Sequence, residues 1–242
     1  MAIKKLINTP LGSVCCECEL PNAPRSVLVL HGFASSRNST SGKTLSTLLA
    51  QRSIGSLRID FNGCGESYGL PSETSVTKML SDAQASLDEL AKTNATVGIY
   101  GSSMGGFIAL LLASRNENVK AIVLRAPVSN FTKQWQRKTS LDEWRSNGSF
   151  EWKFLYGEGS IILPWSFYQD GAQYDALKEA RKITAPVLVM HGDADETVPL
   201  QQSEELARQL PNCTLEKLRG ESHQFQSEAH FERMARFFDE KL

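Results

Sequence analysis

The sequence lacks the features that mark membrane, secreted and nucleic-acid-binding proteins. No stretch approaches the roughly 18 consecutive apolar residues of a membrane span. The apolar stretch after Lys4 and Lys5 is too short for the core of a signal peptide. The net charge of −1 provides no excess positive charge to attract nucleic acid. We therefore expect a cytoplasmic protein with no membrane span and no nucleic-acid partner, and the sequence leaves its oligomeric state open.

Cysteine is also scarce, and its placement argues against a disulfide framework. The chain has five cysteines, an odd number, and three of them, Cys15, Cys16 and Cys18, crowd one short segment. Adjacent cysteines suit a reducing compartment. A metal site at these cysteines lacks a second cluster of ligands, and the chain has no H-E-x-x-H or paired C-x-x-C motif. We expect the three cysteines to pack on a strand, and we expect no metal and no organic cofactor.

What the chain does have is a series of apolar runs that alternate with amphipathic segments. Residues 2–20 predict a β-hairpin that turns at Asn8-Thr9-Pro10. After it, the pattern predicts strands at 25–30, 54–59, 96–100 and 119–124, and helices at 43–51, 76–90 and 106–113. Continuous apolar strands that alternate with helices indicate an α/β protein with a mostly parallel sheet covered on both faces. A length of 242 residues fits one domain, residues 1–242.

One serine stands in a turn of unusual composition. Ser103 is at the centre of Gly101-Ser102-Ser103-Met104-Gly105, between the strand at 96–100 and the helix at 106–113. This G-x-S-x-G order of strand, turn and helix is typical of a nucleophile elbow, in which a strained turn exposes the serine hydroxyl. Glycines flank the turn because larger side chains would collide with the neighbouring elements. Ser103 is therefore the candidate nucleophile, and the adjacent Ser102 is expected to be structural.

An acidic loop and a histidine follow in the chain. The segment 191–199, His-Gly-Asp-Ala-Asp-Glu-Thr-Val-Pro, comes directly after an apolar run, and His223 precedes the last helix. The order Ser…Asp…His resembles that of the α/β-hydrolases. The resemblance extends from about Arg25 to the C-terminus. It is strongest to the small carboxylesterase and acyl-peptidase-like branch that includes the cinnamoyl (feruloyl) esterases.

The resemblance assigns the triad. His223 matches the family's base, and Asp195 matches the acid of the pattern H-G-x-x-D-x-x-V-P, with Asp193 expected to satisfy backbone amides instead. The other histidines are expected to hold loop geometry (His31 and His191) or to pack or face solvent in the last helix (His230).

The resemblance also assigns an oxyanion hole, which needs two backbone N–H donors. They are expected from Met104, which follows the nucleophile, and from Phe33, in the loop after the first parallel strand. The turn at 60–67, which resembles the family's D-x-x-G-x-G-x-S, is expected to support that loop.

Aromatic residues concentrate in one segment. Half of the twenty aromatic residues lie between Phe131 and Tyr168, including all four tryptophans, Trp135, Trp144, Trp152 and Trp165. α/β-Hydrolases insert a lid at this point in the chain, so we expect a lid at about 128–172, with the four tryptophans walling a substrate pocket. The alternative is that these aromatics only fill a local core.

The sequence therefore predicts a carboxylesterase-type serine hydrolase that cleaves a small-molecule ester of a small or medium acyl or aryl group through an acyl-enzyme. Three alternatives stay open. They are a thioesterase or acyltransferase on the same triad, an aminopeptidase-like peptidase, and a non-enzymatic ligand receptor. The peptidase would need an acidic cluster to hold a substrate amine, for which Asp142 and Glu143 are weak candidates.

Overall fold

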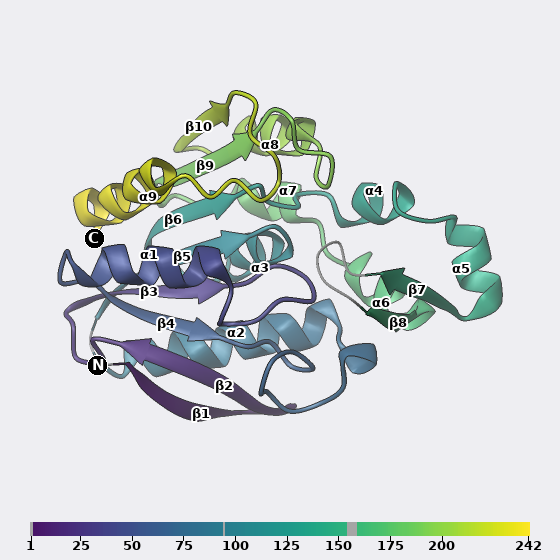
Figure 1. The fold of residues 1–242 in the computed structure, drawn as a ribbon, viewed down its shortest axis with the longest axis horizontal. Helices are drawn as coiled ribbons and strands as arrows, with labels where there is room; N and C mark the ends of the chain where they lie inside the picture. Colours follow the sequence, from purple (N-terminus) through teal and green to yellow (C-terminus); the bar gives the residue numbers. More distant parts are fainter. Residues whose placement is uncertain (1, 94, 154–158) are drawn as a thin grey trace.

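An eight-stranded sheet runs through the computed structural model, which describes residues 2–93, 95–153 and 159–242 (Figure 1). In sheet order the strands are β1 (Ile3–Thr9), β2 (Gly12–Glu19), β4 (Gly55–Ile59), β3 (Arg25–Leu30), β5 (Thr96–Ser102), β6 (Val119–Arg125), β9 (Val187–Gly192) and β10 (Cys213–Leu218). β2 pairs antiparallel with β1 and β4, and every pair from β4 to β10 is parallel. The expected N-terminal hairpin and mostly parallel sheet are confirmed.

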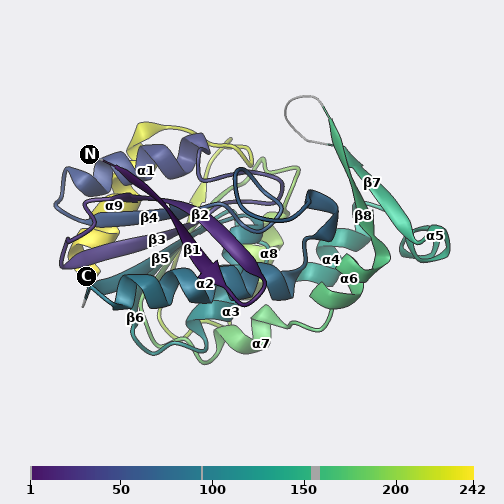
Figure 2. The same ribbon diagram turned by 90° about the horizontal axis from the view of Figure 1, so that it is seen from below.

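Helices cover both faces of this sheet (Figure 2). One face carries α1 (Thr40–Ala50) and α9 (Glu228–Lys241), and the other carries α2 (Val76–Ala91), α3 (Met104–Ala113) and α7 (Ala176–Ala180). α8 (Leu200–Ala207) packs on β9 and β10, and a short 3-10 helix spans Pro71–Glu73. Within the described residues, no helix combines the length and the apolar character that crossing a bilayer requires.

The core consists of two apolar clusters, one on each face of the sheet. In β3, Val27 and Val29 belong to the cluster under α1 and α9, whereas Leu28 and Leu30 belong to the cluster under α2 and α3. Successive side chains of a strand point to opposite faces, so a strand buried on both faces must be apolar at every position. This is why the strands could be found from continuous apolar runs.

Helix α1 begins three residues before the expected range of 43–51. Its first residue is Thr40, because Ser39 caps the helix: the Ser39 side chain accepts a hydrogen bond from the Gly42 N–H. The apolar spacing of Leu45, Leu48 and Leu49 indicated the buried face but not this start.

We call residues 128–172 the aromatic segment; its described parts, 128–153 and 159–172, lie beyond the carboxyl ends of the central strands (Figures 1 and 2). The segment contains α4 (Phe131–Gln136), α5 (Leu141–Asn147), β7 (Ser149–Lys153), β8 (Ser160–Pro164) and α6 (Trp165–Gly171). β7 and β8 form a separate antiparallel pair. Residues 154–158, which include Phe154 and Tyr156, lie outside the described residues.

The three clustered cysteines all lie in β2 and are buried. Burial raises the pKa of the Cys16 thiol to about 12 and also raises that of Cys18. A raised pKa disfavours the thiolate, which is the form that binds metals and attacks electrophiles. The three thiols therefore act as packing side chains of the sheet.

Candidate active site

Ser103 lies on a strained turn between β5 and α3. Its backbone has φ 54° and ψ −116°, in the positive-φ range that non-glycine residues rarely adopt. The turn is held by a hydrogen bond from the Ser103 N–H to the Arg125 carbonyl, at 2.9 Å. A Cβ atom on Gly101 would collide with the backbone of Gly105, and one on Gly105 would collide with the carbonyl of Leu30. Close approach of three backbone segments thus explains both glycines of the motif.

His223 and Asp195 meet through a short hydrogen bond. The distance from His223 Nδ1 to Asp195 Oδ2 is 2.6 Å, and Asp195 Oδ1 accepts hydrogen bonds from the N–H groups of Thr197 (2.8 Å) and Val198 (2.9 Å). Burial alone would raise the pKa of Asp195, but hydrogen bonds from His191 and His223 outweigh it and hold this pKa below its usual range. The ionised carboxylate can only accept, so we assign the proton of neutral His223 to Nδ1. This tautomer leaves Nε2 free to accept a proton.

His191 is a second partner of Asp195. Its Nε2 lies 2.9 Å from the Val198 carbonyl oxygen and 3.1 Å from Asp195 Oδ2, and both of these atoms are acceptors. Nε2 therefore carries the proton, and Nδ1 accepts a hydrogen bond from the Ser203 hydroxyl at 2.6 Å. His191 was expected to hold loop geometry, and its wholly buried ring does so by orienting the Asp195 carboxylate.

The remaining acidic and histidine candidates lie elsewhere. Asp193 Oδ1 accepts a hydrogen bond from the Gly220 N–H at 2.6 Å, which is the amide-satisfying role expected of it. His230, in α9, contacts Glu221 Oε1 at 3.0 Å and does not line the pocket described below. His31 donates from Nδ1 to the Gly32 carbonyl and accepts from the Phe61 N–H at Nε2, so it ties the loop after β3 to the turn after β4.

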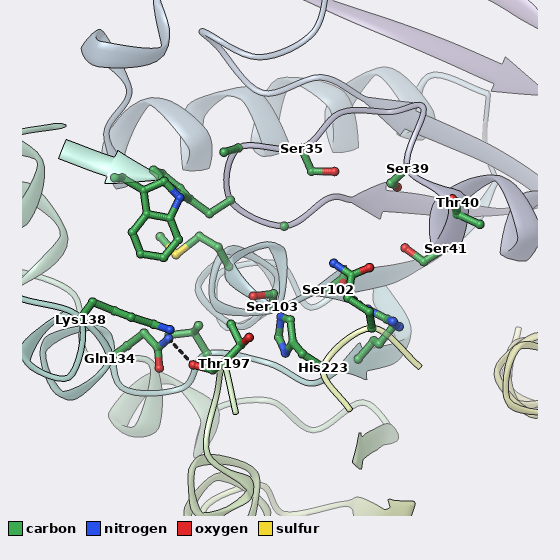
Figure 3. Close-up of a pocket in the computed structure, with 18 of the residues that line it drawn as sticks. Ser35, Ser39, Thr40, Ser41, Ser102, Ser103, Gln134, Lys138, Thr197 and His223 are labelled. Atoms are coloured by element: carbon green, nitrogen blue, oxygen red, sulfur yellow. Dashed lines mark hydrogen bonds between the residues drawn. The ribbon is translucent and has the colours of Figure 1, made fainter. Parts of the chain in front are cut away.

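Ser103 and His223 line one pocket of about 350 Å³ (Figure 3). Figure 3 shows Gln134 and Lys138 on one side of Ser103 and Ser39, Thr40 and Ser41 on the other. We call the first side the apolar half; Figure 3 also shows Thr197 there, and Trp152 belongs to it because Lys138 Nζ lies over its ring. The rings of Phe33 and Trp135, which also line the pocket, pack against Trp152. We call the second side the polar half; Figure 3 also shows Ser102 there, and the lining residue Arg125 belongs to it because its Nη1 donates to Ser102 Oγ.

The four tryptophans of the aromatic segment divide into two pairs. Trp135 and Trp152 line the pocket. Trp144 does not: it is 1% exposed, and its Nε1–H donates to the Leu163 carbonyl at 3.0 Å. Trp165 also lies away from the lining and packs against Trp144. The expectation that all four wall the pocket is therefore narrowed to Trp135 and Trp152, since the other two fill the core of the segment itself.

The two expected oxyanion donors flank Ser103. Met104 is the first residue of α3, so its N–H has no partner within the helix. The loop that carries Phe33 lies against the nucleophile, because a Cβ atom on Gly32 would sit 3.4 Å from Ser103 Cβ. Among the described residues, the Phe33 N–H has no hydrogen-bond acceptor. Their convergence on a substrate oxygen stays a prediction.

Several lining residues carry no motif and were missed from the sequence. Gln134 Nε2–H donates to the Thr197 carbonyl at 2.9 Å and Gln134 Oε1 accepts from Gln202, which ties α4 to the loop of Asp195. Lys138 is half-buried, its Nζ lies 5.8 Å from the centroid of the Trp152 ring, and burial lowers its pKa.

In the part of the chain that the structure describes, no group of three or more His, Cys, Asp or Glu side chains is placed to hold a metal ion.

Sequence comparison finds known proteins that are similar to this chain. The profile of the family described as serine aminopeptidase, S33 matches residues 21–150 and 163–230. The chain is 27% identical over 186 residues to the mitochondrial palmitoyl-protein thioesterase ABHD10 of Rattus norvegicus. It is 26% identical over 196 residues to the lysophosphatidylserine lipase ABHD12 of Macaca fascicularis. These matches cover 75% and 78% of this chain, but the chain spans only 62% and 46% of those relatives.

Structural comparison gives the same fold. Est1E from Butyrivibrio proteoclasticus, solved with ferulic acid bound, has a TM-score of 0.84 at 23% identity, covering 98% of this chain and 96% of that chain. The α/β hydrolase domain-containing protein 10 from mouse also has a TM-score of 0.84, at 22% identity, covering 98% of this chain and 97% of that chain. At these identities the likeness shows the α/β-hydrolase fold and transfers no substrate.

Proposed function

The chain belongs to the family described as serine aminopeptidase, S33, and from this premise we propose that it cleaves carboxylic esters of small or medium acyl or aryl groups. The observation that carries the proposal is that Ser103, on its strained turn, shares a pocket with His223, whose Nδ1 is bonded to Asp195. A hydroxyl nucleophile, a base and an ionised acid in this relation are the parts that acyl transfer requires.

The reaction follows from the tautomer of His223. Its free Nε2 takes the proton of Ser103 as Oγ attacks the substrate carbonyl, and Asp195 stabilises the imidazolium that forms. The N–H groups of Phe33 and Met104 stabilise the negative charge on the carbonyl oxygen. His223 then returns the proton to the leaving alcohol, and a water molecule releases the acid from the acyl-enzyme by the same steps.

The charge of the pocket favours an ester over a peptide. An aminopeptidase must hold a protonated α-amino group, which needs an acidic partner. Among the lining residues that the structure describes, none is acidic, and Lys138 and Arg125 are both cations. Asp142 and Glu143, the weak candidates for an amine site, are exposed at the start of α5 and do not line the pocket.

The apolar half suits the acyl or aryl part of the substrate. The rings of Phe33 and Trp152 meet edge to face with centroids 5.9 Å apart, and those of Trp135 and Trp152 do so at 5.2 Å. Such walls bind apolar and aromatic groups by burial. We therefore propose that the aromatic segment acts as the lid of this pocket.

The test is hydrolysis of p-nitrophenyl esters of graded acyl length and of methyl ferulate by the wild type and Ser103→Ala. Ser103→Ala should lose about 10⁴-fold or more in turnover, as removal of a triad member does. Ser102→Ala is the matched control and should lose far less, because the Ser102 hydroxyl accepts from Arg125 and is not the nucleophile. Acyl-thioester and aminoacyl-anilide substrates belong in the same assay. A wild type that cleaves only thioesters would replace the ester proposal with a thioesterase, which the name of the rat relative favours.

A further inference from the structure

Arg125 is a buried cation without an acidic partner. Its side chain comes from the end of β6 and is 3% exposed, yet it lines the polar half of the pocket. Nη1 donates to Ser102 Oγ at 3.2 Å, Nη2 donates to the Phe225 carbonyl at 2.7 Å, and the guanidinium stacks 4.4 Å from the centroid of the Phe225 ring. Nε–H has no acceptor among the described residues, and no carboxylate there pairs with the group. A buried charge without a counter-charge is unfavourable, so a feature that supplies the missing negative charge is expected nearby.

The first turn of α1 faces the same half of the pocket. Ser39, Thr40 and Ser41 line it and contribute three hydroxyl groups (Figure 3). α1 has eleven residues, and Ser39 Oγ accepts from the Gly42 N–H, whereas the N–H groups of Thr40 and Ser41 have no acceptor among the described residues. The positive end of the helix dipole and these free donors favour an anion.

We propose that the polar half of the pocket is a subsite for an anionic group, a phosphate or a carboxylate, on the leaving-group side of the ester. The assignment rests on the proposed function and names its substrate class: an ester with an apolar acyl part and an anionic alcohol part. With the carbonyl carbon at Ser103, the acyl part extends toward Trp135 and Trp152, and the alcohol part extends toward Arg125 and α1.

Lys138 is the other cation of the pocket, but its charge does not require a bound anion as counter-charge. It is half-exposed, so water solvates its ammonium group, and it stacks on Trp152 in the apolar half. Arg125 is nine-tenths buried, has no carboxylate partner among the described residues and leaves its Nε–H without an acceptor, which makes it the cation that a bound anion would complete.

The experiment compares three esters that share one acyl group: propyl butyrate, 2-carboxyethyl butyrate and 3-phosphooxypropyl butyrate. We expect at least one anionic ester to have a KM about tenfold or more below that of propyl butyrate, the effect of one added charge-assisted hydrogen bond. The two anionic esters separate carboxylate from phosphate recognition. The preference should shrink as salt rises from low concentration to about 0.5 M, because salt screens the attraction.

Ser41→Glu and Ser41→Gln form the decisive pair. Glutamate near a helix N-terminus is compatible with folding, and its carboxylate would occupy the subsite, whereas glutamine has the same size and no charge. The KM ratio of neutral to anionic ester should collapse in Ser41→Glu and persist in Ser41→Gln. Arg125→Met should also reduce the ratio, and Arg125→Lys should retain more of it.

A wild-type KM ratio of neutral to anionic ester near one would overturn the subsite, as would a ratio that Ser41→Glu leaves unchanged. Neither result would count against ester hydrolysis. Failure of the wild type on all three esters would instead count against the proposed function. In that case calorimetric titration with inorganic phosphate decides the subsite. Binding that is lost in Ser41→Glu and kept in Ser41→Gln supports it, and absence of binding to the wild type overturns it.

Discussion

Asp82 should make the stability of this protein depend on pH in an unusual direction. The carboxyl group lies in α2 and is wholly buried. Its Oδ2 accepts a hydrogen bond from the Asn62 N–H at 2.7 Å, whereas Oδ1 has no partner among the described residues. Burial raises the pKa of Asp82 from 3.8 to about 6. A shift of roughly two units corresponds to about 3 kcal/mol between the two protonation states.

The sign follows from which state binds the proton more tightly. A raised pKa in the folded protein means that folding disfavours the ionised carboxylate. The free-energy cost of burying the ionised carboxylate therefore acts in full above pH 6. This cost is relieved as the pH falls from about 6 toward 3.8, where Asp82 of the unfolded chain also becomes protonated. Asp82 thus makes the protein more stable at mildly acidic pH than at neutral pH.

Asp82→Asn should remove this dependence. The Asn side chain keeps an acceptor for the Asn62 N–H, but leaving its buried Nδ2–H₂ group unpaired costs about 1 to 3 kcal/mol. The net gain in stability at neutral pH is therefore smaller than the cost of burying the ionised carboxylate. The quantity to measure is the difference in unfolding free energy between Asp82→Asn and wild type. It should change by about 2.4 kcal/mol between pH 4 and pH 7.5, in favour of the mutant at the higher pH.

Denaturation with urea at pH 4, 6 and 7.5 measures this difference. Asp88→Asn, at an exposed position of the same helix, serves as the control for loss of one carboxylate from α2. A difference between Asp82→Asn and wild type that is the same at pH 4 and pH 7.5 would refute the reasoning, because it would show that Asp82 titrates alike in the folded and unfolded states.

The triad supports two further predictions. His223→Ala should lower kcat/KM by about 10⁴-fold, whereas His230→Ala, which loses only a contact with Glu221, should stay within a few-fold of wild type; comparable losses in both would sink the assignment of the base. Asp195→Asn should lower kcat by about 10⁴-fold because its amide can donate to Nδ1 and so force the proton of His223 onto Nε2. Because hydrogen bonds from His191 and His223 hold the pKa of Asp195 below its usual range, Asp195 should stay ionised across the acidic end of the wild-type pH–rate profile.

The centre of the site could be predicted because its geometry constrains the local sequence. Gly101 and Gly105 are required by the close approach of backbones around the strained turn of Ser103. These steric requirements act on five consecutive residues, so they can be recognised as a sequence motif. Asp195 could be separated from Asp193 only through the family pattern, since both stand in one loop and differ in which partner they meet: His223 in one case, the Gly220 amide in the other.

The orientation of the tryptophans could not be predicted in this way. Aromatic composition indicates that a segment is buried, but a pocket wall and a local core have the same composition. Trp135 and Trp144 both lie on short helices of the aromatic segment, and both are almost fully buried. Trp144 is turned into the segment by its hydrogen bond to the Leu163 carbonyl, nineteen residues along the chain. A contact at that separation leaves no local pattern.

The polar half of the pocket could not be predicted from the sequence, for a related reason. Arg125 is the last residue of β6, and Ser41 lies in the first turn of α1. The two line one pocket only because of the order of strands in the sheet. The apolar spacing of Leu45, Leu48 and Leu49 reports the face that α1 buries, but it says nothing about where the helix starts. Ser39 determines that start, and Ser39, Thr40 and Ser41 are the residues of this region that line the pocket. A boundary error of three residues is small for the fold, but here it falls on the groups proposed to select the substrate.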